Sequence, residues 1–311
     1  MPEVVISEFM DEAAVGMISA RHDTLYDPEL VDRPDDLAAA VQSARALVVR
    51  NRTKVTAALL EASATLQCVG RLGVGLDNID LDACKARGVA VYPATGANDV
   101  AVAEYVVTAA LMLLRGAYTA PEDVASGAWP RQRLMAGGEA MDKRLGLVGY
   151  GAIARQAAKR ARVLGFSIAA FDPFLPEGDP AFEGCERLEL ADLLKTSDVV
   201  SLHVPLTEKT RHMIDAGAIA GMKRGAILIN TARGGVIDEA ALAEALTSGA
   251  LGGAALDVFE TEPLTAEAGA KFSGIANLIL TPHIAGLTAE SNVRVSSVTA
   301  ENVLKHLEKT A

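Results

Sequence analysis

Short apolar runs alternate along the chain with longer segments in which hydrophobic residues recur every three or four positions. In the first third of the sequence the apolar runs lie at residues 4–6, 47–49, 66–69 and 89–92. Segments with the helical pattern lie between them, for example at residues 36–43 and 81–87. Strands that alternate with helices in this way predict βαβ units and a parallel sheet.

A long helical pattern then interrupts the series. It spans residues 98–117, with Asn98 or Asp99 as its expected N-cap, and a polar, irregular segment follows at 121–143. A second series of apolar runs comes next, at residues 145–148, 168–171, 199–202, 227–230, 254–256 and 278–280. An amphipathic helix is expected at 289–308. The pattern therefore predicts an α/β protein with two doubly wound parallel sheets.

Length and charge narrow the classes of function. A chain of 311 residues fits two compact domains. Its net charge of −11 argues against binding to nucleic acid or an anionic membrane through a positive field. Cys68, Cys84 and Cys185 show no metal-binding spacing, so we expect reduced thiols and no metal site. The amino-terminal residues lack the features of a signal peptide, which predicts a cytoplasmic location.

A glycine motif follows the first strand of the second series. Gly149-Tyr-Gly151-Ala-Ile-Ala154 leads from that strand into a predicted helix at 152–164. Gly149 would form the tight turn, Gly151 would admit a pyrophosphate, and Ala154 would let the helix pack close to the strand. The expected cofactor contacts in this turn are Gly149, Gly151, Ala152, Ile153 and Ala154.

An acidic residue in the next strand turn specifies the cofactor. Asp172 ends the predicted strand 168–171 and lies 18 residues after Ala154. A carboxylate there can accept hydrogen bonds from the ribose hydroxyls and would repel a 2′-phosphate. The sequence therefore predicts NAD rather than NADP.

A second glycine pair has a different interpretation. Gly73-Val74-Gly75 also follows a strand, but Asn78 takes the position of the third small residue of a dinucleotide motif. Exposed backbone N–H groups in such a turn can bind an anion. We therefore expect Val74 and Gly75 to bind a carboxylate.

Three charged or titratable residues follow successive strands of the second series. Arg233 follows strand 227–230, Glu262 follows strand 254–256, and His283 follows strand 278–280. The carboxyl ends of parallel strands border the ligand crevice of an open sheet, so these side chains are expected to meet there. A cation, an acid and an imidazole suit hydride transfer at C2 of a 2-hydroxy acid, which needs a carboxylate anchor and a proton acceptor beside the cofactor.

With these motifs in their order and spacing, the chain resembles the D-isomer-specific 2-hydroxyacid dehydrogenases over nearly its whole length. The matching stretches are residues 49–50, 53–56, 73–80, 149–154, 230–235, 255–263 and 281–286. The resemblance implies that His283 is the general base, that Glu262 orients the imidazole and raises its pKa, and that Arg233 binds the substrate carboxylate.

The resemblance also implies further cofactor contacts and an architecture. Thr231 and Asp257 would hold the nicotinamide, while Val204 and Pro205 would line the cofactor cleft. Residues 1–98 plus 286–311 would form a discontinuous substrate domain, and residues 99–285 the NAD-binding domain. Catalysis would occur in a cleft between the two domains, and the family implies a homodimer.

Local arginines suggest a second anionic group on the substrate. Arg50 and Arg52 follow strand 47–49, and Arg71, Arg131 and Arg133 are further candidate cations. Residues 6–13, 49–53 and 96–105 resemble the (S)-sulfolactate dehydrogenase subgroup of the family, so the expected reaction converts (S)-sulfolactate to sulfopyruvate.

Several other functions stay open. D-3-phosphoglycerate, glyoxylate and hydroxypyruvate are alternative substrates, and formate would need a site shaped for one carbon. A non-enzymatic NADH-sensing co-repressor is a more distant alternative, for which basic or disordered tails would be expected.

Overall fold

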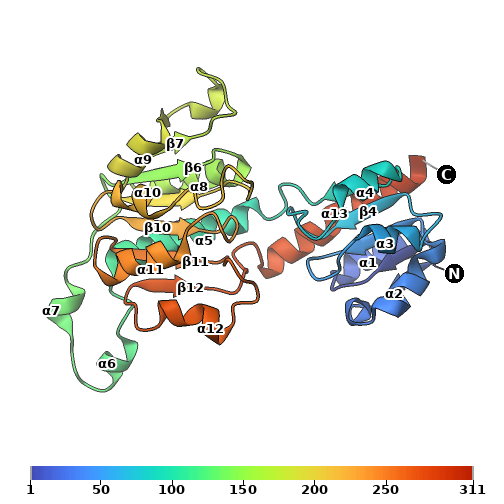
Figure 1. Ribbon diagram of the computed structural model, residues 1–311, viewed down its shortest axis with the longest axis horizontal. Helices are drawn as coiled ribbons and strands as arrows, with labels where there is room; N and C mark the ends of the chain where they lie inside the picture. Colours follow the sequence, from blue (N-terminus) through green and yellow to red (C-terminus); the bar gives the residue numbers. More distant parts are fainter. Residues whose placement is uncertain (1, 310–311) are drawn as a thin grey trace. The chain divides into compact units, whose positions relative to one another are not determined.

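The computed structural model describes residues 2–309 (Figure 1). The chain divides into two compact units. One, the discontinuous unit, consists of Met1–Asn98 and Leu287–Ala311; the other, the central unit, is Asp99–Gly286. Each unit contains one parallel sheet covered by helices, so the predicted fold class is confirmed.

The sheet of the discontinuous unit has five parallel strands. They are β1 (Val4–Ile6), β2 (Thr24–Tyr26), β3 (Ala46–Val49), β4 (Cys68–Arg71) and β5 (Ala90–Pro93), in the spatial order β2-β1-β3-β4-β5. This is the order of flavodoxin-like sheets, in which the direction of winding changes between β1 and β3. The segments that follow β1 and β3 therefore border the place where such sheets bind ligands.

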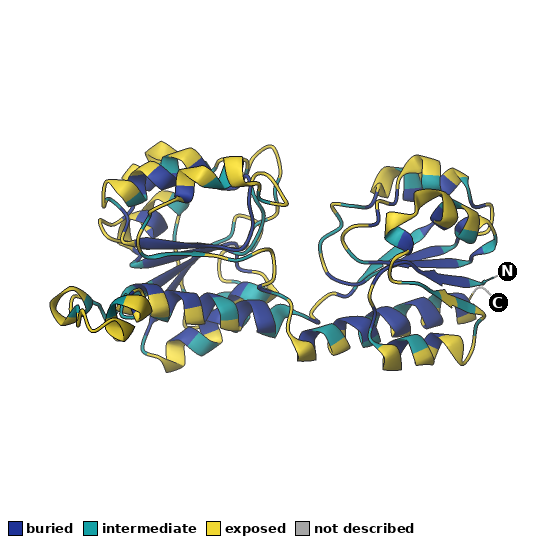
Figure 2. Ribbon diagram, turned by 90° about the horizontal axis from the view of Figure 1, so that it is seen from below, coloured by how far each residue is buried: buried dark blue, intermediate teal, exposed yellow. Residues whose placement is uncertain are grey.

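Alternating side chains divide this unit into two cores. Val4 and Ile6 of β1 point to one face and Val5 to the other, and all three are fully buried. The first face is covered by α1 (Glu12–Ser19) and by the last helix, α13 (Ala289–Lys309), while α2 (Pro34–Ala40), α3 (Ala57–Glu61) and α4 (Leu81–Ala86) lie over the second. Figure 2 shows the buried residues gathered in the sheet and on the inner sides of these helices.

The central unit has a seven-stranded parallel sheet. Its strands are β6 (Arg144–Val148), β7 (Ser167–Phe171), β8 (Glu186–Arg187), β9 (Val199–Leu202), β10 (Ile227–Asn230), β11 (Gly253–Leu256) and β12 (Leu278–Leu280). The spatial order is β12-β11-β10-β9-β6-β7-β8, so the winding changes direction between β6 and β9. This is the Rossmann order with one strand added beyond the sixth.

Helices cover both faces of the central sheet. On one face lie α5 (Asp99–Arg115) and α8 (Ala152–Val163), and on the other α9 (Leu190–Thr196), α10 (Ala216–Ala220) and α11 (Glu239–Thr247), with α12 (Ala266–Gly269) near the end of the unit. Helix α8 buries Ala154, Ala157, Ala158 and Ala161. These small side chains allow its backbone to approach the sheet and α5 closely.

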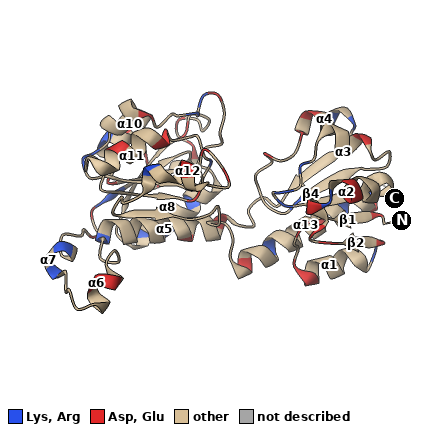
Figure 3. Cartoon of the chain, turned by 60° about the horizontal axis from the view of Figure 1, so that its bottom comes forward, with Lys and Arg blue, Asp and Glu red and all other residues tan. Residues whose placement is uncertain are grey.

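The structure adds elements that the apolar pattern did not predict. Strands β2 and β8 are short sheet edges without a buried residue, and they lack the apolar run of a central strand. The segment predicted to be irregular, 121–143, contains α6 (Pro121–Ala125) and α7 (Arg131–Leu134). Figure 3 shows acidic residues, in red, on α6 and basic residues, in blue, on α7. Within residues 2–309, the helices are too short or too polar to cross a membrane.

Candidate active site

Three neighbouring strands of the central sheet end at one edge. Asn230 at the end of β10 is in register with Leu256 of β11, which is in register with Leu280 of β12. The next residues along each strand are therefore adjacent, and within six residues of these ends the chain presents Arg233, Glu262 and His283. The expectation that parallel strand ends bring these segments to one edge agrees with the register.

His283 and Glu262 form a hydrogen-bonded pair. Nδ1 of His283 lies 2.7 Å from Oε2 of Glu262, and the other carboxylate oxygen accepts a hydrogen bond from the Phe259 N–H at 3.0 Å. The hydrogen bond to Glu262 raises the pKa of His283, against the opposing effects of burial and of the Arg233 charge. Burial by itself would raise the pKa of Glu262, but the bonds from His283 and Phe259 outweigh it and lower that pKa. The pair is thus suited to hold and release a proton.

The backbone that bears His283 is fixed by Asp257. His283 has a φ of 56°, in the left-handed region, and its N–H donates to the Asp257 carbonyl at 2.8 Å. The buried Asp257 carboxylate accepts from the Thr281 hydroxyl at 2.6 Å and from the N–H groups of Ile284 and Ala285 at 2.8 Å each. Asp257, predicted only as a cofactor contact, therefore also shapes the turn that presents the imidazole.

The turn that bears Arg233 touches the Glu262 loop. The Asn230 side chain accepts from the Ala232 N–H at 3.0 Å and donates to the Arg233 carbonyl at 2.9 Å. A Cβ on Gly234 would lie only 1.7 Å from the Phe259 carbonyl oxygen, so only glycine allows the two backbones to meet. The charge of Arg233 lowers the pKa of both Glu262 and His283. The structure thus brings the three predicted catalytic residues together.

The glycine motif forms a tight turn between β6 and α8. Gly149 has a φ of +86°, and a Cβ there would lie 2.7 Å from the His203 carbonyl oxygen and 3.1 Å from the Val204 side chain. The Asp172 carboxylate accepts from the N–H groups of Tyr150 and Phe174, each at 2.9 Å. The acid at the end of β7 therefore fixes the glycine turn from the other side. Val204 and Pro205 follow β9, the neighbour of β6 at the change of winding.

The geometry of this turn fits a dinucleotide. Gly151 is the N-cap of α8, no side chain caps that helix end, and a Cβ on Gly151 would meet no atom within 4 Å. The first N–H groups of α8 can therefore receive a pyrophosphate. Near the end of β10, the Thr231 hydroxyl is buried without a hydrogen-bond partner among the described residues, as expected of a group that awaits a polar ligand.

In the discontinuous unit a buried acid organises the loop that follows β3. The Glu8 carboxylate, 4% exposed, accepts from the N–H groups of Arg50 at 2.8 Å, Arg52 at 3.1 Å and Thr53 at 2.9 Å. The Asn78 side-chain amide donates to the carbonyls of Arg50 and Thr53. Sequence reasoning missed Glu8; the available signal was an acid two residues after an apolar strand beside the change of winding.

The two arginines of that loop have different partners. Arg50 donates to Asn292 Oδ1 at 2.5 Å, and its guanidinium lies 5.7 Å from the centre of the Phe9 ring. Arg52 forms an ion pair with Asp32, and 58% of its side chain is exposed. The charge of Arg52 is therefore already balanced by a paired carboxylate, whereas the hydrogen-bond partners of Arg50 are neutral and the Glu8 carboxylate acts on its guanidinium only through its charge.

Two of the other three candidate cations, Arg71 and Arg133, bind groups within ten residues of them in the sequence. Arg71 donates to the carbonyls of Gly75 at 2.8 Å and Leu72 at 2.5 Å, so its guanidinium holds the turn that contains Val74 and Gly75. Arg133, on α7, pairs with Asp123 on α6. Arg131 lies on α7 as well.

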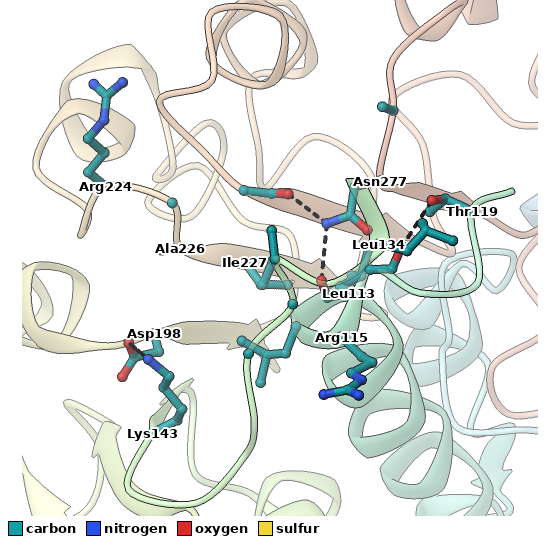
Figure 4. Close-up of a pocket in the computed structure, with 18 of the residues that line it drawn as sticks. Leu113, Arg115, Thr119, Leu134, Lys143, Asp198, Arg224, Ala226, Ile227 and Asn277 are labelled. Carbon is teal, nitrogen blue, oxygen red and sulfur yellow. Dashed lines mark hydrogen bonds and ion pairs between the residues drawn. The ribbon is translucent and has the colours of Figure 1, made fainter. Parts of the chain in front are cut away.

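A cavity of about 540 Å³ lies at the opposite, amino-terminal edge of the central sheet (Figure 4). It is lined by the end of α5, by part of the 116–138 segment and by the residues that precede β6, β9, β10, β11 and β12. Asp198 in its wall accepts from Lys223 at 2.7 Å and lies 3.5 Å from Lys143. Of the predicted candidate residues, only Arg133 lines this cavity. We therefore place the active site at the carboxyl ends of the strands and not in this cavity.

Comparison with known proteins gives a consistent assignment. Residues 107–285 match the family model of the D-isomer specific 2-hydroxyacid dehydrogenase, NAD binding domain. The chain is 55% identical to an (S)-sulfolactate dehydrogenase of Chromohalobacter salexigens over 99% of both chains, and 40% identical to a hydroxypyruvate reductase of Thermotoga maritima over 98% of both. Its fold matches a D-lactate dehydrogenase from Aquifex aeolicus, solved with NAD and lactic acid, with a TM-score of 0.85, 30% identity and coverage of 98% of this chain and 96% of that one. The chain belongs to the D-isomer specific 2-hydroxyacid dehydrogenase family and is an NAD-dependent oxidoreductase.

Proposed function

We propose that the protein interconverts (S)-sulfolactate and sulfopyruvate with NAD. The main support for this substrate is the 55% identity, over 99% of both chains, with an (S)-sulfolactate dehydrogenase. The handedness is compatible with a D-specific family, because sulfur outranks the carboxyl group in naming priority and the D-like isomer of sulfolactate is therefore labelled S. Because the hydrogen-bond partners of the Arg50 guanidinium are neutral, its positive charge would be available to the sulfonate.

In the proposed reaction His283 is the proton acceptor. NAD supplies the carbon that accepts the hydride from C2. His283 takes the proton of the C2 hydroxyl during oxidation and returns it during reduction, and the 2.7 Å bond from Nδ1 to Glu262 leaves Nε2 as the nitrogen for that exchange. Arg233 binds the substrate carboxylate and polarises the C2 oxygen, and the Val74–Gly75 backbone binds the other carboxylate oxygen.

The proposed cofactor contacts follow from the geometry of the glycine turn in the central unit. Gly149, Gly151, Ala152, Ile153 and Ala154 would hold the pyrophosphate at the start of α8, and Asp172 the adenosine ribose. Around the nicotinamide we propose the following contacts: Thr231, Asp257, Val204 and Pro205. The central unit would then be the NAD-binding domain, and the discontinuous unit the substrate domain.

We also propose that the protein is a homodimer in the cytoplasm. The 116–141 segment exposes large apolar side chains: Tyr118 is 66% exposed, Trp129 71%, Met135 68% and Met141 62%. Apolar groups gathered on one segment favour a protein interface. Light scattering coupled to size exclusion tests the dimer; a monomeric wild-type protein at micromolar concentration contradicts it.

A second candidate activity is reduction of hydroxypyruvate, because a relative with that name is 40% identical over 98% of both chains. D-3-Phosphoglycerate is a third candidate, since its phosphate could also use Arg50. Both differ from sulfolactate in the group at C3, so one set of assays separates the three.

The experiment is NAD⁺ reduction, followed by absorbance, with (S)-sulfolactate, (R)-sulfolactate, D-3-phosphoglycerate, D-glycerate, D-malate and D-lactate. We expect the highest kcat/KM for (S)-sulfolactate and little turnover of its R isomer. A higher kcat/KM for D-glycerate than for (S)-sulfolactate would favour hydroxypyruvate reduction as the activity. A higher kcat/KM for D-3-phosphoglycerate would favour oxidation of that phosphorylated acid. Equal activity toward D-lactate would contradict a pocket for a second anion.

A further inference from the structure

A charged cluster with one buried member, Glu239, contacts the loop that bears Glu262, residues 257–263 (the Glu262 loop). Glu239 is the first residue of α11 and is only 4% exposed. Its Oε2 accepts from Lys271 Nζ at 2.9 Å, and its Oε1 accepts from the Glu260 N–H at 2.7 Å. None of these three residues was predicted as part of the site, and none of them pairs with His283 or Arg233 in the contacts described above.

The helix and the loop are joined in both directions. The Glu260 carboxylate accepts from the Glu239 N–H at 3.3 Å and lies 3.0 Å from Nε2 of His212. Each of the two glutamates therefore accepts the backbone N–H of the other. This reciprocal arrangement fixes the amino end of α11 against the Glu262 loop, in the way that a capping box fixes a helix end.

The connection is short enough to affect the catalytic pair. Glu260 lies between Phe259, whose N–H donates to Glu262 at 3.0 Å, and Glu262 itself, whose other oxygen meets His283 at 2.7 Å. The loop also packs against Gly234, where no side chain would fit. Besides the bonds of the Asp257 carboxylate at its start, the loop is thus held by its contact with Gly234 and by the charged side chain of Glu239.

The Lys271 end of the ion pair reaches solvent, with 33% of its side chain exposed, and ion pairs open to solvent contribute little stability. The Glu239–Lys271 pair therefore calls for an explanation other than stability. Its geometry supplies one, since a carboxylate oxygen at 2.7 Å from a single backbone N–H fixes the position of that N–H.

We propose that Glu239 is a positioning residue for the His283–Glu262 pair. By holding the Glu260 N–H, its Oε1 sets the place at which the Glu262 carboxylate meets the imidazole, and Lys271 balances its charge. The inference rests on the proposed function, in which His283 is the proton acceptor and Glu262 its partner.

Two substitutions separate position from charge. Glu239→Asp keeps the charge beside Lys271 but withdraws the carboxylate by one methylene, so the Glu260 N–H loses its acceptor. Glu239→Gln combined with Lys271→Met removes both charges but keeps an amide oxygen for that N–H. Glu244→Asp, an exposed acid on the same helix, is the control for shortening a glutamate. The measurements are kcat, KM, NADH affinity, the pH dependence of kcat/KM and the proton NMR signal of the His283 Nδ1–H.

We expect Glu239→Asp to lower kcat by about 10- to 100-fold, with NADH affinity unchanged, because small displacements of catalytic groups have effects of that order. The acidic limb of kcat/KM for oxidation should move to lower pH and the Nδ1–H signal should move upfield, while the double variant and Glu244→Asp retain the wild-type limb.

If the acidic limb of kcat/KM in Glu239→Asp lies at the same pH as in the wild type, the proposal is overturned, whether or not kcat falls. A shifted limb in the folded double variant also overturns it, which decides the question even if Glu239→Asp does not fold. If replacing His283 itself leaves turnover intact, the proposed function has failed and not the role of Glu239 within it.

Discussion

The two sheets of this protein place polar side chains after their strands in similar positions but connect them differently. In the central unit the titratable groups are coupled to one another: His283 bonds Glu262 at 2.7 Å, and Arg233 acts on the pKa of both. In the discontinuous unit the buried Glu8 carboxylate is satisfied by backbone N–H groups. Arg50 contacts an amide, a carbonyl and an aromatic ring.

This difference corresponds to two tasks. Proton transfer needs neighbouring groups that shift one another's pKa values, whereas recognition of an anion needs a fixed cation whose charge has not been neutralised by a carboxylate. Under the proposed function, the same doubly wound topology would therefore serve acid–base chemistry in one unit and anion recognition in the other. The distinction lies in the contacts of the strand-end residues and not in the fold.

The largest expected effect is that of His283→Gln. Loss of the proton acceptor should reduce kcat by about 10²–10⁴, with little change in NADH affinity. His22→Gln is the matched control, because Nδ1 of His22 also faces a glutamate, Glu3, at 3.1 Å. Wild-type turnover in the His283 variant would remove the contrast between the two units.

Arg50→Gln tests the anion site in the discontinuous unit. It should raise KM for (S)-sulfolactate by about 10- to 100-fold, which is the range for a hydrogen bond to a charged group. The KM for D-lactate should change little, because D-lactate has no second anion. Arg52→Gln should have a smaller effect, since its charge is already balanced by Asp32. Equal losses with both acids in Arg50→Gln would show that no distal anion is bound there.

Asp172→Ala has the smallest expected effect among these variants. Loss of a carboxylate acceptor for the ribose should weaken NADH binding by about 10-fold and reduce the preference over NADPH. Glu177→Ala, an exposed acid in the same segment, is the control. An unchanged ratio of NADH to NADPH affinity, measured by fluorescence titration, would exclude Asp172 from cofactor selection.

Most of the architecture could be predicted from the sequence because the central strands are fully buried. Runs such as 199–202 and 227–230 are mostly apolar and are buried on both faces, and their predicted limits agree with β9 and β10. Edge strands β2 and β8 could not be predicted in this way, since none of their residues is buried and the sheet pairing that defines them is not local.

The titratable side chains of the candidate site could be predicted from the sequence, but the residues that hold them in place could not. Arg233, Glu262 and His283 stand at strand ends, which the strand pattern locates. Glu8 and Glu239 are buried acids whose partners include backbone N–H groups brought close by folding. A sequence does not show which backbone N–H groups lack a hydrogen-bond partner within their own helix or strand. The side chains that accept from such groups therefore cannot be found by a search for motifs.

The measurement that tests the central claim most directly is the pH dependence of kcat/KM for NAD⁺-linked oxidation, in the wild type and in Glu262→Gln. Because oxidation needs neutral His283 and Glu262 raises the pKa of that imidazole above its ordinary value of 6.5, activity in the wild type should be lost as the pH falls through a value above 6.5. In Glu262→Gln the limb should move to lower pH, with a lower kcat. An identical limb in both proteins would contradict a mechanism based on the His283–Glu262 pair.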